Sequence, residues 1–242
     1  MDSEVNSGQW SSGEKRLAES EPLWRQIAEF LLVAFLVVLV MASIRHFVVQ
    51  RFYIPSASMS STLEPGDYVL ASRLTPKPFA VERGDVVIFN DSGHWLGEPE
   101  ELSSPLWEKS LVWLGLRNDR AHQQLIKRVI GLPGDRVKCC DAQGRVSVNG
   151  VSINEPYVRS GEAPSTIPFD ITIPAGRLWV MGDNRGYSAD SRLHRDKPGD
   201  GSIPESDVLG KAIAVAWPWD RMHWLRSYSN VFDAVPPASS GS

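Results

Sequence analysis

The sequence has few cysteines, no excess of basic residues and a single long apolar run. Its two cysteines, Cys139 and Cys140, are adjacent in a chain of 242 residues. Neighbouring Cα atoms lie about 3.8 Å apart, closer than a relaxed disulfide prefers, so we expect no disulfide framework. A zinc site is also disfavoured, because zinc-binding cysteines usually have two or more residues between them.

The charge balance excludes another class of partner. The formal net charge is −4, whereas nucleic-acid binding depends on clustered Lys and Arg, so we expect no nucleic-acid partner. The mean hydropathy of −0.20 is typical of a soluble protein. With 19 glycines and 17 prolines the chain is rich in turns, and its length allows one large or two small domains.

The apolar run covers residues 27–44 and contains one charged residue, Glu29, near its edge. Eighteen helical residues span about 27 Å, close to the hydrocarbon thickness of a bilayer. A cleaved signal peptide is the alternative. The preceding leader is long and contains several acids, and the run lacks an A-x-A cleavage pattern, so we expect a retained transmembrane anchor at residues 25–46.

The basic residues near this anchor give its orientation only weak support. Lys15, Arg16 and Arg25 precede it, while Arg45 and Arg51 follow it. This small excess favours a cytoplasmic N-terminus. The polar residues 1–24 are then a cytoplasmic tail.

Short apolar runs separated by turn residues follow the anchor and predict a mainly β domain over residues 47–228. The expected strands are 68–73, 85–90, 125–130, 178–181 and 211–217. Asn149-Gly150 lies between two alternating apolar runs, which is a strong signal for a β-hairpin. We expect an insertion at about residues 91–122 and a disordered tail at residues 229–242.

Two groups of tryptophans leave two interpretations open. Trp95, Trp107 and Trp113 fall in the insertion, and Trp217, Trp219 and Trp224 fall near the C-terminus. Each group is explained equally well by core packing or by a surface resting at a membrane interface.

Three segments carry polar groups suited to catalysis. A serine-rich stretch follows the anchor and runs directly into an expected strand, although a linker has similar composition. No histidine lies in a recognisable catalytic context, and no G-x-S-x-G or H-E-x-x-H pattern occurs. The remaining candidate base is a buried lysine, such as Lys127 in an apolar strand, although most strand lysines are simply exposed. The third segment, residues 180–192, suits a supporting loop or an ordinary surface turn.

Taken together, these segments closely resemble the type I (leader) signal peptidase family of bacteria, whose members use a Ser/Lys dyad. The matching motifs occur in the family's order: PSASM at 55–59, RGDVVIF at 83–89, IKRVIGLPGD at 126–135, NEPY at 154–157 and GDNRGYSADSR at 182–192. The resemblance covers about residues 25–225 without the insertion. It implies an antiparallel β-sheet domain with a small extra β or insertion region, preceded by one transmembrane helix.

The resemblance also implies roles for individual residues. Ser58 is the expected nucleophile, Lys127 the general base, and Ser56 the oxyanion-hole hydroxyl that acts with the Ser58 N–H. Ser188 is expected to orient the lysine. Asp190 and Arg192 form a supporting ion pair, and Asp183 and Arg185 are structural. Shallow pockets for the small side chains of a signal peptide are walled by Phe52, Ile54, Met59, Leu63 and Ile126.

The implied protein is a serine endopeptidase that removes signal peptides from exported preproteins at the cell membrane. It needs no cofactor or metal, and its catalytic domain lies outside the cytoplasm. Its expected partners are signal peptides, the lipid bilayer and, as a candidate, the secretion translocon. Ala57 and Ser61 depart from the family's usual Gly and Pro without removing a catalytic group.

Two other classes are weighed against this interpretation. A self-cleaving repressor-type protease shares the β scaffold and the dyad, but it lacks the anchor and the final motif. An inactive, membrane-tethered peptide-binding module is disfavoured by the intact Ser58, Lys127 and Ser188.

Overall fold

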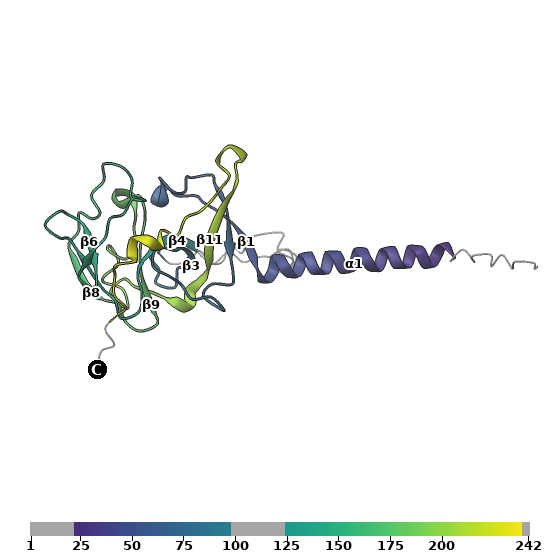
Figure 1. The fold of residues 1–242 in the computed structure, drawn as a ribbon, viewed down its shortest axis with the longest axis horizontal. Coiled ribbons are helices and arrows are strands. Elements are labelled where there is room, and N and C mark those ends of the chain that lie inside the picture. The colour runs from purple at the N-terminus through teal and green to yellow at the C-terminus, as the bar shows by residue number, and fades with distance from the viewer. Residues whose placement is uncertain (1–21, 98–123, 239–242) are drawn as a thin grey trace, which may run out of the picture. The chain divides into compact units, whose positions relative to one another are not determined.

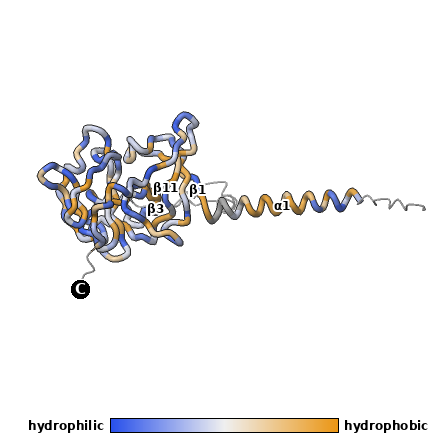
Figure 2. Tube along the Cα trace, in the orientation of Figure 1, coloured by the Kyte–Doolittle hydropathy of each residue, from blue (hydrophilic) through white to orange (hydrophobic). Residues whose placement is uncertain are grey.

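The computed structural model describes residues 22–97 and 124–238, and the chain divides into two compact units, Met1–Ala42 and Ser43–Ser242. Most of α1 (Leu23–Phe47) belongs to the first unit (Figure 1). Its stretch Leu23–Met41 has a mean hydropathy of 2.1 and no buried residue. Figure 2 shows the apolar character of this stretch. Nineteen residues rise about 28 Å, so among the described residues this is the helix that is long and apolar enough to cross a membrane.

The second unit is built on two antiparallel sheets, which confirms the predicted mainly β class. The larger sheet has the order β1-β2-β11-β3-β4-β9-β10, with β12 paired to β11. Its strands are β1 (Val49–Tyr53), β2 (Tyr68–Ser72), β3 (Val86–Asn90), β4 (Gln124–Gly131), β9 (Arg177–Met181), β10 (Ile203–Pro204), β11 (Val208–Trp217) and β12 (His223–Trp224). The short 3-10 helices are η1 (Ala57–Met59), η2 (Arg185–Tyr187), η3 (Glu205–Asp207), η4 (Trp219–Arg221) and η5 (Ser229–Phe232).

The smaller sheet has the order β7-β6-β5-β8 and lies at the end of the domain away from β1 and β11 (Figure 1). Its strands are β5 (Arg136–Cys139), β6 (Val146–Val148), β7 (Val151–Ser152) and β8 (Phe169–Thr172). Asn149 and Gly150 both have positive φ between β6 and β7, as the predicted hairpin turn requires.

Strand β3 shows why the larger sheet is buried on both faces. Val86 and Ile88 belong to one apolar cluster, while Val87 and Phe89 belong to another. Successive residues of a strand point to opposite faces, so four consecutive apolar residues serve two cores. The long central strand β11 has three register shifts, and such bulges bend a strand and increase its twist.

The C-terminal segment differs from the prediction. We expected disorder from residue 229, but Phe232 and Val235 are buried in the core cluster of the smaller sheet. The Pro236 carbonyl also accepts a hydrogen bond from Asn149 Nδ2 at 2.9 Å. The segment is therefore held against the domain by the burial of Phe232 and Val235, although its prolines and small residues are typical of a disordered tail.

The predictions for the two cysteines, for Trp95 and for the insertion have three different outcomes. Cys139 and Cys140 are paired with each other in a disulfide, which ties no distant segments together. Trp95 packs edge-on against Phe89 and stacks on His194, as in the core interpretation. Most of the insertion, residues 98–122, lies outside the described residues, and Trp107 and Trp113 lie there too.

The C-terminal tryptophans favour the surface interpretation. Trp217, Trp219 and Trp224 are 45%, 70% and 77% exposed. Trp217 and Trp219 contact each other edge to face, so large apolar rings are held together at the surface. An exposed aromatic group of this kind suits a membrane interface better than water.

The turn at Gly84 offers a test of this fold. Gly84 has a φ of +90°, and a Cβ there would overlap the carbonyl oxygen of Ser227. We predict that Gly84→Ala lowers the free energy of unfolding by about 2–4 kcal/mol, combining backbone strain with overpacking. Gly144, with a φ of +77° and no neighbour within 4 Å, is the matched control, for which we expect about 1 kcal/mol. Urea unfolding of the detergent-solubilised chain measures both, and equal losses would contradict the predicted overlap.

Candidate functional site

Ser58 lies in the short turn that follows the first strand of the domain. Pro55 ends the extended segment, and the Ser60 N–H bonds to the Ala57 carbonyl to close η1. Met59 is fully buried in an apolar cluster and anchors the turn to that cluster. The Ser58 side chain is therefore held by its neighbours in a buried position, with only 6% of the residue exposed.

Lys127 reaches Ser58 from the middle of the larger sheet. It lies in β4, opposite Val87 of β3, and β9 pairs with the other edge of β4. Its Nζ is 2.6 Å from Ser58 Oγ, and the residue is 2% exposed. The structure thus brings together two residues that are 69 positions apart in the sequence.

Burial changes the protonation of this amine. Loss of hydration lowers the pKa of Lys127 from 10.5 to about 8. The charges of Asp190 and Asp183 oppose this shift, and the charge of Arg192 adds to it. A lysine with a pKa of about 8 has a substantial neutral fraction near neutral pH, so it can accept a proton from a hydroxyl.

Ser56 lies beside this pair. Its Oγ is 3.2 Å from Ser58 Oγ, and the residue is exposed. A hydroxyl at this place is within hydrogen-bond distance of the reactive oxygen and open to an incoming ligand. That arrangement is compatible with the oxyanion-hole role expected for Ser56, which remains a prediction.

The loop after β9 supplies the buried Asp190–Arg192 ion pair. Arg192 Nε and Nη2 each donate to the Asp190 carboxylate at 2.8 Å, and the Gly182 N–H donates to it at 3.0 Å. Burial alone would raise the pKa of Asp190, but hydrogen bonding and charge from Arg192 lower it. Asp190 therefore remains ionised and paired inside the protein.

Ser188 is buried in the same loop. Its hydroxyl is close enough to Asp190 to lower that carboxylate's pKa, yet it makes no hydrogen bond of ordinary geometry with the described residues. A Cβ at Gly182 would overlap both Ser188 Oγ and the Ser58 carbonyl oxygen. Gly182 therefore allows Ser188 to approach η1, the turn that carries Ser58 and is called the nucleophile turn below for the expected role of this serine, while the expected contact between Ser188 and Lys127 stays a prediction.

Asp183 and Arg185 each form a buried ion pair beside the site. Arg128 donates to the Asp183 carboxylate at 2.8 and 2.6 Å, and both side chains are fully buried. Arg185 pairs with Glu155 at 2.9 and 2.6 Å. The sequence analysis assigned no role to Arg128 or Glu155, although both lie in motifs that it identified.

Asn184 is a further residue that the sequence analysis missed. Its Nδ2 donates to the Ala57 carbonyl at 2.9 Å, and its N–H donates to the Ser58 carbonyl at 3.2 Å. Both carbonyls belong to the nucleophile turn, so Asn184 positions Ser58 from the opposite loop. Its place between Asp183 and Arg185 was the available signal, but side-chain direction in a loop does not follow from sequence.

The expected pocket residues gather in one apolar cluster. The members of this cluster named by the sequence analysis are Phe52, Ile54, Met59, Leu63 and Ile126. Each is less than 9% exposed. That they wall pockets for a signal peptide remains a prediction. Within residues 22–97 and 124–238, His, Cys, Asp and Glu form no group of three that could hold a metal ion.

A buried lysine touching a serine in a β domain defines a candidate hydrolytic site, and comparison with known proteins identifies the family. Residues 27–217 match the family described as signal peptidase, peptidase S26. Signal peptidase I from Mycobacterium tuberculosis strain H37Rv is 33% identical over 93% of this chain and 83% of that protein. Signal peptidase I from Pseudomonas aeruginosa is 31% identical over 87% of this chain and 79% of that protein.

A solved structure of a signal peptidase I from Enterococcus faecalis matches 54% of this chain and 95% of that chain, with 25% identity and a TM-score of 0.35. The match of residues 27–217 and the relatives at 30% identity or more establish the assignment. The chain belongs to the signal peptidase family, peptidase S26. Membership in this family implies a peptidase that removes signal peptides.

The lysine environment generates a direct prediction. We expect an NMR titration of the Lys127 side chain to have a midpoint near pH 8, because burial destabilises the ammonium form. Lys127→Met assigns the signal, and unfolding in denaturant should return the midpoint toward 10.5. A midpoint near 10.5 in the folded protein would mean that the amine is hydrated.

Proposed function

We propose that the protein is a membrane-bound serine endopeptidase that cleaves signal peptides from exported preproteins, with Ser58 as nucleophile and Lys127 as general base. The observation that carries this proposal is the 2.6 Å contact between Lys127 Nζ and Ser58 Oγ. It supports the dyad because the same amine is 2% exposed and has a lowered pKa. A serine needs an adjacent base to become a nucleophile, and a desolvated lysine is such a base.

In the first half of the reaction, neutral Lys127 takes the Ser58 proton while Oγ attacks the scissile carbonyl carbon. The tetrahedral intermediate collapses as the peptide C–N bond breaks. The departing amine receives the proton from the Lys127 ammonium group and leaves as the new N-terminus of the mature protein. The signal peptide is left as an ester on Ser58.

In the second half, neutral Lys127 takes a proton from water, and the resulting hydroxide attacks the ester carbonyl. Ser58 Oγ leaves and regains its proton from Lys127, and the signal peptide is released as a carboxylic acid. Ser56 Oγ and the Ser58 N–H donate to the developing oxyanion in both halves. Loss of one such donor typically lowers the rate about 10²–10³-fold.

Substrate recognition depends on the apolar cluster next to η1. A signal peptide binds as an added β-strand, with small residues at positions −1 and −3. Phe52, Ile54, Met59, Leu63 and Ile126 bound shallow pockets that accept alanine. Larger side chains are excluded by overlap with these walls.

The apolar helix α1 and the exposed aromatic surface support a location at the cell membrane. α1 crosses the cell membrane with the N-terminus in the cytoplasm, and the β domain lies on the outer side, where cleavage sites emerge. Trp217, Trp219 and Trp224 rest at the lipid interface, because they are exposed on the β domain. The bilayer is then a partner of the protein, and the translocon is a candidate supplier of substrate.

Removing either dyad member tests the proposed function. We predict that Ser58→Ala and Lys127→Met each lower kcat for a secretory preprotein by at least about three orders of magnitude. Lys138→Met is the matched control, because Lys138 is also a strand lysine but its side chain is 55% exposed. Unfolding curves show whether each variant is folded. Near-wild-type turnover by Lys127→Met would refute the dyad, and absence of turnover by wild type would favour a binding module.

A chelator should leave the rate of preprotein cleavage by wild type unchanged.

The pKa of Lys127 predicts the pH dependence. The base must be unprotonated, so kcat/KM should rise about tenfold per pH unit below pH 8 and level off above it. Preprotein cleavage assayed from pH 6 to pH 9 measures this profile, with protein stability checked at each pH. A rate that is flat, or that falls as pH rises, would exclude neutral Lys127 as the base.

A further inference from the structure

A polar groove opens beside the nucleophile turn and has no role in the mechanism above. Its volume is about 390 Å³, and its walls include Ala57, Ser60 and Asn184. A 3-10 helix has three residues per turn, so Ala57 and Ser60 share one face of η1. Met59 projects from another face into the apolar cluster. The groove and the apolar cluster therefore meet different faces of η1.

The wall of this groove contains a buried acceptor without a donor. Asn184 is 3% exposed, and its Oδ1 has no hydrogen-bond partner among the described residues. Its orientation is fixed because Nδ2 donates to the Ala57 carbonyl, which can only accept. Buried polar atoms are nearly always paired in proteins, so Oδ1 marks a place where a ligand N–H fits.

The groove is lined by one anion, Glu64, and one cation, Arg159, and the two differ in how they are held. Glu64 is already occupied, since its carboxylate accepts from Ser60 Oγ at 2.8 Å and from the Ser61 N–H at 3.3 Å. Arg159 is held only loosely, because its side chain is 60% exposed and lies 3.9 Å from Glu162. The groove thus offers an exposed, weakly paired cation beside a buried acceptor that has no donor.

We propose that this groove binds the mature part of the preprotein, immediately after the scissile bond, and that Arg159 selects for acidic side chains there. This inference rests on the proposed function, because the apolar cluster takes the residues before the bond that Ser58 attacks. The mature part of the bound preprotein, which continues past Ser58, then passes along the face of η1 that carries Ala57 and Ser60. Asn184 Oδ1 accepts one of its backbone N–H groups.

Two preproteins with the same signal peptide test this proposal, one with glutamates and one with lysines at the first three mature positions. Wild type should cleave the acidic substrate with a kcat/KM about two- to fivefold higher, as expected for one exposed charge contact. Arg159→Glu should reverse the preference. High salt should reduce both effects, because exposed charges are screened.

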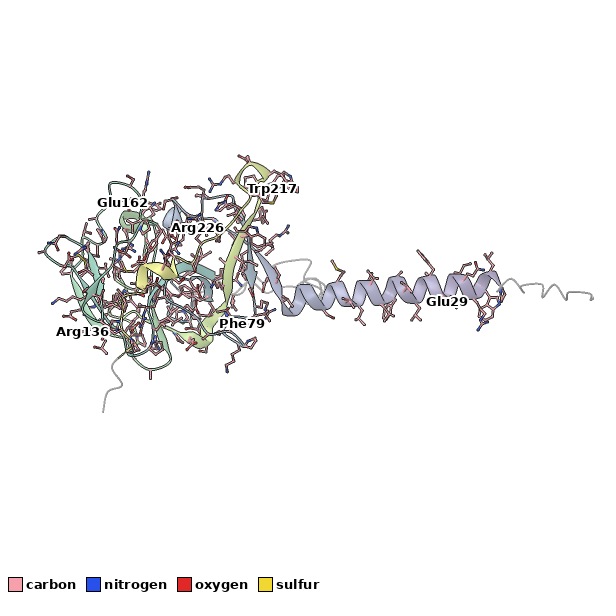
Figure 3. All side chains as sticks on the ribbon, viewed as in Figure 1. Glu29, Phe79, Arg136, Glu162, Trp217 and Arg226 are labelled. Atoms are coloured by element: carbon pink, nitrogen blue, oxygen red, sulfur yellow. A yellow bond between two sulfur atoms is a disulfide. The ribbon has the colours of Figure 1, made fainter. Side chains whose placement is uncertain are left out.

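Arg136→Glu is the matched control. The Arg136 side chain is 64% exposed and, like Arg159, is paired with a carboxylate. Figure 3 shows Arg136 well separated from Glu162, the neighbour of Arg159. Arg136→Glu should therefore keep the wild-type preference. N-methylation of one mature backbone amide should lower kcat/KM about three- to tenfold, because the bond to Asn184 is lost.

The outcomes separate the two proposals. Equal preference ratios for wild type and Arg159→Glu, with cleavage that still requires Ser58, would overturn the groove assignment alone. The same conclusion follows if Arg136→Glu shifts the ratio as much as Arg159→Glu does. Cleavage of neither substrate by wild type, or cleavage retained by Ser58→Ala, would overturn the proposed function and this inference with it.

Discussion

The burial of Lys127 is the constraint on which the site depends. An ammonium group loses most of its hydration at 2% exposure, and this loss favours the neutral amine. The strand β4 can hold such a group because β3 and β9 flank it on both sides and keep water away. The only polar atom bonded to Nζ in the described part of the chain is Ser58 Oγ. The fold itself thus lowers the pKa of this amine, as the role proposed for Lys127 requires.

This constraint explains why the charges around Lys127 occur in pairs. Three guanidinium–carboxylate pairs are buried in and beside the loop after β9: Arg128–Asp183, Arg185–Glu155 and Arg192–Asp190. An unpaired carboxylate near the amine would raise its pKa and keep it protonated. Because each carboxylate has an arginine partner, the opposing fields of Asp183 and Asp190 are weaker than the effect of burial. The ion pairs therefore limit how far the carboxylates oppose the lowering of the Lys127 pKa.

Much of the fold follows from local sequence, but the support of the site does not. The strands and the hairpin were predictable because alternation and Asn-Gly are local signals. The Ser58–Lys127 pairing came from family resemblance, since no local pattern joins residues so far apart. The roles of Arg128 and Asn184 depend on which loop carbonyls and carboxylates meet them in three dimensions. The packing of Phe232 was missed for the same reason, because its partners lie on distant strands.

The nucleophile turn cannot position itself, and this links catalysis to recognition. η1 has three residues, too few for its own hydrogen bonds to fix a side chain to within a fraction of an ångström. Asn184 donates hydrogen bonds to two of its carbonyls, those of Ala57 and Ser58. Gly182 has no side chain, so the loop after β9 can also approach the Ser58 carbonyl oxygen. The same Asn184 lines the polar groove, and its Oδ1 has no hydrogen-bond partner among the described residues. A ligand bound at the proposed groove site would contact the side chain that places Ser58, so we expect the residues after the scissile bond to influence kcat as well as KM.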